Sequence, residues 1–424
     1  MASGSAIGGI GRALSSSNFR QYFYGLLGST TGFWAYRVAL GWQIWELTHS
    51  PAWLGGIVFV EVVPMLLLGP IGGTLVDQKG SLIITRTMQA CWALLMAGLA
   101  AATLAGFAHI SFLLVIAFLQ GAIAGFSNPG HLALIARVVP RQDLSPAVAL
   151  QSGVVQCGRF IGPAIAGPLL AAYGPGMVYA LVAVAFVAAA INLWFVTTLE
   201  PERPGGSRGF RGDFIDGVRY TRDHFAIRTI ILYTAAMSFL LRPVVELLPG
   251  FADVVFQRGA EGLAWLMMSF GLGSLVSAIH IAARGQTKGL TNMFIVNLVI
   301  GAISLLAFGL LPHFWTAMGL TVIIGMSTNT VSIVSQILAQ HMVAGHMRAR
   351  VMSILGTTFR AVPAAGALLQ GSAASFFGLA TPVLAGSILC ILAWMRLVQI
   401  ARTHDLARKA EEDTSADKPA KVTT

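Results

Sequence analysis

Long apolar runs joined by short polar connections make up most of the 424-residue chain. A helix of about 20 mostly apolar residues crosses the hydrocarbon core of a bilayer, and the sequence contains twelve such runs. Because the runs are continuous and do not alternate between polar and apolar positions, they predict membrane helices and not the strands of a barrel. The twelve predicted helices are 21–46, 52–76, 82–106, 110–136, 146–172, 176–196, 228–251, 261–284, 290–311, 314–342, 350–376 and 380–401.

The longest polar connection, 197–227, divides the twelve runs into two sets of six. Each set contains a helix with a central arginine followed closely by proline, Arg159 with Pro163 and Arg360 with Pro363. We therefore predict an all-α membrane protein of two pseudo-symmetric six-helix bundles. The predicted segments are an amino-terminal segment 1–20, a bundle 21–196, a linker 197–227 with an amphipathic helix at 210–225, a bundle 228–402 and a disordered tail 403–424.

The positions of the charges change how the basic composition is interpreted. The chain is 56% hydrophobic and only 10% charged, with a net charge of +10, whereas soluble domains carry about 25% charged residues. Most of its 27 basic residues fall in the termini and in alternate connections, and the other connections hold one, Arg258. The positive-inside rule therefore predicts a multi-pass protein of the inner membrane with both termini in the cytoplasm. We expect the protein to lie in the lipid bilayer and to bind no nucleic acid.

Four short motifs carry a resemblance to a known family. The first is a loop with Gly73, Asp77 and Gly80, and the second, in the fifth helix, has Gly158, Gly162, Pro163 and Gly167. The other two are the segment 19–51, which ends in Glu-Leu-Thr-His-Ser-Pro, and the segment 348–353, Arg-Ala-Arg-Val-Met-Ser. The loop resembles the signature of the major facilitator superfamily, the fifth helix resembles the antiporter signature of its drug-export branch, and the last two resemble its enterobactin-exporter subgroup.

The resemblance implies a monomeric transporter that works by alternating access and is not an enzyme. Its loop signature is altered, because Gln78, Ser81 and Leu82 stand where basic residues are usual, and Ala149 replaces the first glycine of the antiporter signature. Two interpretations of Asp77 remain open. Asp77 forms a gating contact that is made and broken as the bundles rock, or it is a local cap at a helix terminus.

Six charged residues lie deep inside the predicted helices, away from the helix ends, where a charge is costly and by default marks a functional site. They are Arg37, Glu61, Arg159, Arg242, Glu246 and Arg360. Since the resemblance places the second helix beside the eleventh, we predict an ion pair of Glu61 with Arg360, either a static packing contact or a bridge made in one conformation. Arg242 and Glu246 are four residues apart and can pair within one helix. The surplus of arginine favours an anionic cargo.

Motifs for other energy sources and for metal chemistry are missing from the sequence. It has no phosphate-binding loop of the form GxxxxGK[ST] and no cluster with the spacing of catalytic metal ligands. We therefore expect no cofactor and no metal, and a proton gradient as the energy source. The main hypothesis is proton-coupled export of a small organic molecule that is siderophore-like or drug-like. The alternatives are a transport-inactive scaffold or receptor with the same fold, and an importer of a small solute or iron species.

Overall fold

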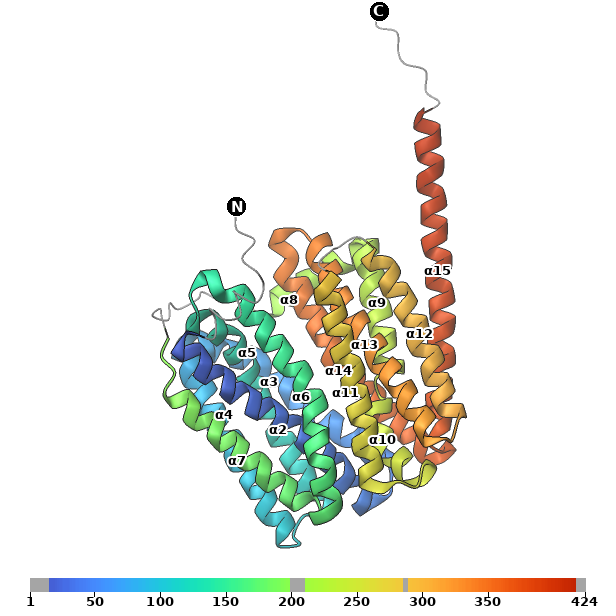
Figure 1. Cartoon of the computed structure of the whole chain (residues 1–424). Helices are drawn as coiled ribbons and strands as arrows, with labels where there is room; N and C mark the ends of the chain where they lie inside the picture. Colours follow the sequence, from blue (N-terminus) through green and yellow to red (C-terminus); the bar gives the residue numbers. More distant parts are fainter. Residues whose placement is uncertain (1–14, 199–209, 285–288, 417–424) are drawn as a thin grey trace, which may run out of the picture.

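Helices joined by short turns form the protein in the computed structural model, which describes residues 15–198, 210–284 and 289–416 (Figure 1). The amino-terminal half comprises α2 (Ser17–Thr48), α3 (Pro51–Lys79), α4 (Ser81–Leu104), α5 (Ile110–Val138), α6 (Leu144–Tyr173) and α7 (Pro175–Trp194). A connecting helix, α8 (Phe210–Asp223), follows. The carboxyl-terminal half comprises α9 (Phe225–Leu240), α10 (Val244–Gly250), α11 (Gly259–Arg284), α12 (Leu290–Leu310), α13 (Phe314–Met342), α14 (Arg348–Phe377) and α15 (Ala380–Ala416).

The helices confirm the predicted all-α membrane architecture. Eleven spans among the described residues are long and apolar enough to cross a membrane. One of them, Phe225–Val255, combines α9, α10 and a π-helical turn, η2 (Phe251–Val255). The remaining predicted helix, α2, is 32 residues long but less apolar, because glycine, serine, threonine and tyrosine interrupt its hydrophobic positions. It packs against α6 and α7 within the amino-terminal bundle and supplies the twelfth membrane helix.

Glycines make the tightest turns between consecutive helices. Gly80 alone joins α3 to α4 with a φ of 96°, and Gly174 alone joins α6 to α7 with a φ of 75°. Glycine adopts such positive φ values without steric cost, and Pro175 then starts α7 with a φ suited to a first helical position. Each turn therefore reverses the chain directly at the membrane surface, and the two helices that it joins pack mainly against other helices.

The two bundles meet along two helix pairs, α3 with α14 and α6 with α11. We call the side on which α2 begins and α15 ends the termini side, and the opposite side the far side (Figure 1). Gly55, near the far-side end of α3, lies against the backbone of Ala367, and Gly167, near the far-side end of α6, lies against Ala264. Small residues let helix backbones approach closely, so the bundles are held together at the far side.

On the termini side, α3 and α14 diverge around a cavity of about 680 Å³, which we call the vestibule. Its walls include Gly69 and Asp77 of α3, and Ser353 and Arg360 of α14. The protein is therefore closed at the far side and open at the termini side. This arrangement corresponds to one end state of a cycle in which two bundles rock about a central site.

Several boundaries differ from those predicted. α8 ends at Asp223 and lies on α14, where Arg350 Nη1 is 3.3 Å from Asp216 Oδ2. α15 runs on to Ala416, so the predicted disordered tail 403–424 is helical over its first part, and its last residues lie outside the described ranges. The extension contains alanine, arginine, lysine and glutamate, which favour helix strongly. Much of the predicted amino-terminal segment 1–20 and part of the linker also lie outside those ranges.

Candidate functional site

A cavity of about 290 Å³ lies between the bundles, near the middle of the membrane helices. All six charged residues that the sequence places deep inside helices line it, although they come from both halves of the chain. Aromatic rings complete its walls, namely Phe33, Trp34, Phe270 and Phe359. We call this space the central cavity. Because Arg360 lines both spaces, the central cavity and the vestibule adjoin each other at this residue.

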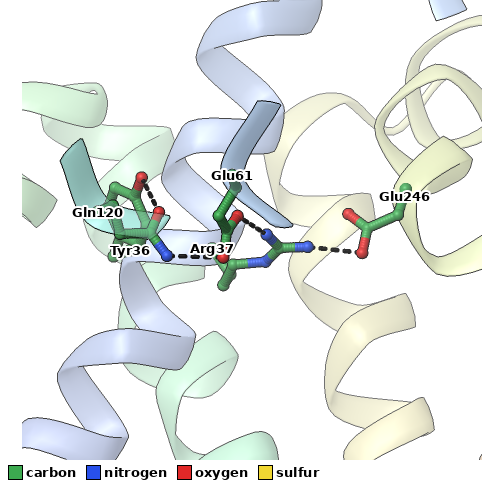
Figure 2. Close-up of polar contacts among 5 residues, drawn as sticks. All are labelled: Tyr36, Arg37, Glu61, Gln120 and Glu246. Atoms are coloured by element: carbon green, nitrogen blue, oxygen red, sulfur yellow. Dashed lines mark hydrogen bonds and ion pairs between the residues drawn. The ribbon is translucent and has the colours of Figure 1, made fainter. Parts of the chain in front are cut away.

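Arg37 of α2 joins the two bundles through a double ion pair (Figure 2). Its Nη1 lies 2.6 Å from Glu61 Oε2 in α3, and its Nη2 lies 2.5 Å from Glu246 Oε1 in α10. Glu61 belongs to the same bundle as Arg37, whereas Glu246 belongs to the other bundle. The guanidinium therefore neutralises two carboxylates at once, and one of these contacts must break when the bundles separate.

The two carboxylates bound by Arg37 are held to different degrees. Gln120 Nε2 of α5 donates a hydrogen bond to Glu61 Oε1 at 2.7 Å, and Tyr36 OH donates to Gln120 Oε1 at 2.8 Å (Figure 2). The side chain of Glu61 is 11% exposed, whereas that of Glu246 is 27% exposed. Glu61 is thus held by a second side chain of its own bundle, whereas Glu246 has Arg37 as its one polar partner among the described residues.

These contacts replace the two ion pairs predicted from the sequence. Glu61 binds Arg37 and not Arg360, because its side chain turns toward α2 and α5 within its own bundle. Arg242 does not pair with Glu246, because α9 ends at Leu240 and α10 begins only at Val244. The turn between them interrupts the helical spacing that would bring residues four apart onto one face.

The other three arginines of the central cavity, Arg159, Arg242 and Arg360, have no carboxylate partner among the described residues; we call them the cavity arginines. The Arg159 guanidinium lies 5.0 Å from the centre of the Trp34 ring, and its buried Nε has no hydrogen-bond partner in the described part of the chain. The Arg242 guanidinium lies 5.6 Å from the Phe359 ring. The aromatic faces partly compensate these cations but leave their capacity to bind an anion.

Prolines supply backbone acceptors next to the cavity arginines. Proline has no N–H, so the carbonyl four residues earlier loses its helical partner. In α14, Pro363 frees the carbonyl of Phe359, which accepts a hydrogen bond from Arg242 Nη1 at 3.4 Å. In α6, Pro163 frees the carbonyl of Arg159 in the same way. The arginine and proline pattern of each half therefore places a freed backbone carbonyl at or beside a cavity arginine.

The glycines of the fifth-helix motif let α6 approach α2. A Cβ at Gly158 would lie 2.9 Å from Thr30 Cγ2, and a Cβ at Gly162 would lie 2.6 Å from Trp34 Cβ. This close packing brings Arg159 within reach of the Trp34 ring. Further along α6, the motif ends at the contact of Gly167 with α11 of the other bundle.

The loop motif lies at the vestibule. Gly73 and Asp77 line it, and Gly80 forms the turn into α4. Asp77 is exposed, and no side chain caps the first turn of α4. The local-cap interpretation of Asp77 thus has no support at this helix terminus. Asp77 faces the space between α3 and α14, where a gate between the bundles would have to act.

Sequence reasoning missed the residues that orient the charged groups, chiefly Tyr36, Gln120 and Phe359. Gln120 gave a signal, because a carboxamide inside the apolar run 110–136 needs a partner when it is buried. The sequence also contained a signal for the Phe359 carbonyl, because Pro363, four residues later, cannot donate a hydrogen bond to it. Among the residues described, no group of three His, Cys, Asp or Glu side chains could hold a metal ion.

The chain resembles known transporters over most of its length. A family model described as transmembrane secretion effector matches residues 12–421. The staphyloferrin A transporter of Staphylococcus aureus (strain NCTC 8325 / PS 47) is 25% identical over 353 residues, which cover 82% of this chain and 87% of that protein. The multidrug efflux pump Tap of Mycolicibacterium fortuitum is 21% identical over 380 residues, covering 87% of this chain and 92% of that protein.

Solved structures show the same fold. The nucleoside transporter NupG has a TM-score of 0.70 and 11% sequence identity, covering 90% of this chain and 98% of that chain. A likeness at this identity shows the arrangement of helices alone. The family model, which matches nearly the whole chain, shows the family as well. Both the family and the fold are those of secondary transporters and not of enzymes. This multi-pass membrane protein therefore belongs to the major facilitator superfamily, in the family described as transmembrane secretion effectors.

Proposed function

We propose that the protein is a proton-coupled exporter that moves a small anionic organic molecule out of the cytoplasm by alternating access. The observation that carries this proposal is the set of cavity arginines in the middle of the membrane helices, which have no carboxylate partner in the described part of the chain. Guanidinium groups form strong, often bidentate hydrogen bonds with carboxylates and similar anions. Ionisable side chains at this depth are rare unless they serve transport. An anionic cargo would therefore complete the charge balance of the central cavity.

The direction of transport rests on topology and on the relatives. The excess of basic residues in the termini and alternate connections supports cytoplasmic termini in the inner membrane. The vestibule would then open to the cytoplasm, where an exporter collects its cargo. Proteins of similar sequence are named as a staphyloferrin A transporter and as multidrug efflux pumps, which supports a small organic cargo and an outward direction. The protein would act as a monomer.

The double ion pair of Arg37 supplies a mechanism for proton coupling that needs no cofactor. When the far side opens, Glu246 moves away with its bundle and loses the guanidinium. A carboxylate left alone in a largely apolar cavity is unfavourable, so it takes up a proton from the outer medium. When the bundles close again, Arg37 recovers Glu246 and the proton leaves to the cytoplasm. One proton thus enters for each cycle, while cargo leaves.

Inverted membrane vesicles that contain the protein test this proposal. The vesicles are given an acidic lumen and an extract of small metabolites from the host cell, and their contents are identified by mass spectrometry. We expect accumulation of one or a few anionic compounds, which stops when the pH gradient is removed. Glu246→Gln should abolish the gradient-driven accumulation yet retain downhill exchange of the same compounds. Absence of any accumulated compound would favour a transport-inactive scaffold, and accumulation of cations alone would contradict the anionic cargo.

A further inference from the structure

The six charged residues of the central cavity do not balance one another. Four are arginines and two are glutamates, so this lining carries a net charge of +2 when all six are ionised. Both glutamates bind Arg37, as Figure 2 shows. The positive excess therefore lies with the cavity arginines, and its size bears on how many negative charges the cargo brings.

Two of the cavity arginines are each held against their own bundle. Arg159 of α6 lies over the ring of Trp34 at 5.0 Å, and Trp34 belongs to α2 of the amino-terminal bundle. Arg242, in the turn between α9 and α10, donates to Ser332 Oγ of α13 at 3.3 Å and to the Phe359 carbonyl of α14 at 3.4 Å. None of these contacts crosses from one bundle to the other. The two guanidiniums therefore belong to cavity walls that different bundles form.

Arg360, the third cavity arginine, differs from these two because it lies where the central cavity adjoins the vestibule. It is exposed and lines both spaces, whereas Arg159 and Arg242 are only partly exposed. Water in the vestibule screens an exposed charge, and a charge between apolar helices is screened much less. The strongest attraction for an anion is therefore expected at Arg159 and Arg242.

Arg159 and Arg242 also act on each other, because their positive charges are close enough to repel. Each still has hydrogen-bonding capacity for a ligand. The buried Nε of Arg159 has no hydrogen-bond partner in the described part of the chain. Both hydrogen bonds of Arg242, at 3.3 and 3.4 Å, are longer than the usual 2.7–3.2 Å for N–H···O bonds. An anionic group can therefore be bound at each of the two guanidiniums.

A cargo with one anionic group would satisfy only one of these arginines. A carboxylate held by Arg159 leaves Arg242 unbalanced, and a carboxylate held by Arg242 leaves Arg159 unbalanced. A cargo with two anionic groups places one at each bundle and brings the two negative charges that neutralise the lining. Because a charge away from water is costly without a partner, the second group binds where it removes such a cost.

The size and the walls of the central cavity limit the rest of the cargo. Its volume of about 290 Å³ is at the lower end for small-molecule sites, which measure about 300–1,000 Å³. The two anionic groups must therefore be only a few bonds apart. The aromatic rings that line the cavity offer apolar surface to the part between them. A compact apolar framework that carries two carboxylates or similar groups fits this lining.

We propose that the central cavity selects a cargo with two anionic groups, one bound by Arg159 of the amino-terminal bundle and the other by Arg242 of the carboxyl-terminal bundle. Such selection rests on the proposed export function of the same site. A cargo bound in this way links the two bundles and neutralises the repulsion between the two arginines, so it favours closing of the termini side. A molecule with one anionic group leaves one of the two charges unbalanced.

Two probes that differ by one carboxylate test this selection. Isophthalate carries two carboxylates on a benzene ring and benzoate carries one, and each is titrated into the purified full-length protein by isothermal titration calorimetry. We expect isophthalate to bind about tenfold more tightly or better, as an added hydrogen bond between charged groups allows. Arg159→Gln and Arg242→Gln should each remove most of this preference, while benzoate still binds at the remaining arginine. Arg258→Gln is the matched control, because Arg258 is an exposed arginine outside the cavity.

The wild-type protein gives a comparison that needs no variant. Equal affinities of the two probes, or no binding of isophthalate, would overturn the selection for two anionic groups. An unchanged preference in Arg159→Gln or Arg242→Gln, or an equal loss in Arg258→Gln, would overturn it too, and the melting temperature of each variant shows that it is folded. Equal binding of the probes would leave export of a singly charged anion intact, whereas the export function itself fails if inverted vesicles accumulate no compound.

Discussion

Arg37 and the cavity arginines line the same space in the middle of the membrane, yet their surroundings are opposite. Arg37 lies 2.6 Å from Glu61 and 2.5 Å from Glu246, and one of these carboxylates comes from the other bundle. Arg159 lies over an aromatic ring, and Arg242 has a ring, a backbone carbonyl and a hydroxyl as neighbours. None of the cavity arginines has a carboxylate partner among the described residues. The charge of Arg37 is therefore balanced by the protein, whereas the charges of the cavity arginines are not.

In the proposed mechanism, this difference separates the residues that hold the conformation from the residues that would bind the cargo. A buried charge is tolerated when an opposite charge and hydrogen bonds compensate it. Arg37 is compensated by the protein, so it stabilises the state that is closed at the far side. The cavity arginines are compensated only in part, so an anion that enters the cavity gains more there than in water. We therefore expect the balanced charge of Arg37 to contribute to the stability of the closed state, and the unbalanced cavity arginines to contribute to the affinity for an anion.

Removing Arg37 should have the largest effect on the comparison. Arg37→Met leaves Glu61 and Glu246 without their cation, and breaking such a buried pair costs about 3–5 kcal/mol. We expect a large drop in the melting temperature of the purified protein. The triple variant Arg37→Met, Glu61→Gln, Glu246→Gln removes all three charges and should recover most of this loss. An unchanged melting temperature in Arg37→Met would show that the ion pairs do not hold this state together.

Removing a cavity arginine should leave the stability of the protein unchanged or higher and should weaken the binding of an anion. Arg242→Gln and Arg360→Gln should leave the melting temperature unchanged or raise it, because each removes a charge that the protein does not balance. Binding of an anionic probe such as citrate should weaken about tenfold or more, the equivalent of about 1.5–3 kcal/mol for a bond to a charged group. Isothermal titration calorimetry measures this loss. Arg258→Gln, at an arginine outside the cavity, should leave citrate binding unchanged.

The far-side contact sharpens the comparison, because Arg37 reaches Glu246 only when the bundles are closed there. A Cβ at Gly55 would collide with the backbone of Ala367, whereas a Cβ at the adjacent Gly56 would meet nothing within 4 Å. Overpacking of this kind costs about 1–3 kcal/mol, so Gly55→Val should shift the protein toward the state that is open at the far side. Labelling of a cysteine introduced at the far side measures the shift. Equal labelling of Gly55→Val and Gly56→Val would contradict the assignment of this contact.

Replacing an aromatic neighbour should have the smallest effect. Trp34→Leu removes the ring that lies under the Arg159 guanidinium, a contact worth about 0.5–2 kcal/mol. We expect citrate affinity to fall a few-fold, because Arg159 is no longer held toward the cavity. Trp53→Leu, at a partly exposed tryptophan of α3, serves as the control in the same titration. A loss as large as that in Arg242→Gln would mean that Trp34 itself contacts the cargo.

Most of the fold was predictable from the apolar runs, because the length and polarity of a segment decide whether it can cross a bilayer. The pairing of its charges was not. Hydropathy places Glu61 within α3 but does not give the rotation of that helix, which points the carboxylate at α2 and α5. The spacing of Arg242 and Glu246 suggested a pair, yet the turn between α9 and α10 separates them. Pro243 marked that turn in the sequence.

The candidate site was predictable as a set of residues but not as a network. Charges inside apolar runs pointed to all six charged residues of the central cavity. Gln120 and Phe359 were not recognised as partners, since one contributes a carboxamide from a different helix and the other a backbone carbonyl. Such partners depend on which helices touch, and that is settled by the packing of both bundles together. The gating role of Asp77 and the predicted proton coupling stay predictions.

The sign of the charge that the central cavity accepts is the most direct test of the whole account. The melting temperature of the purified protein is measured against rising concentrations of citrate and, in parallel, of tetraphenylphosphonium, since a ligand that binds the folded state raises that temperature. We predict that citrate raises it in the wild-type protein and does so much less in Arg242→Gln, while the cation has no effect. Stabilisation by tetraphenylphosphonium and none by citrate would contradict the account.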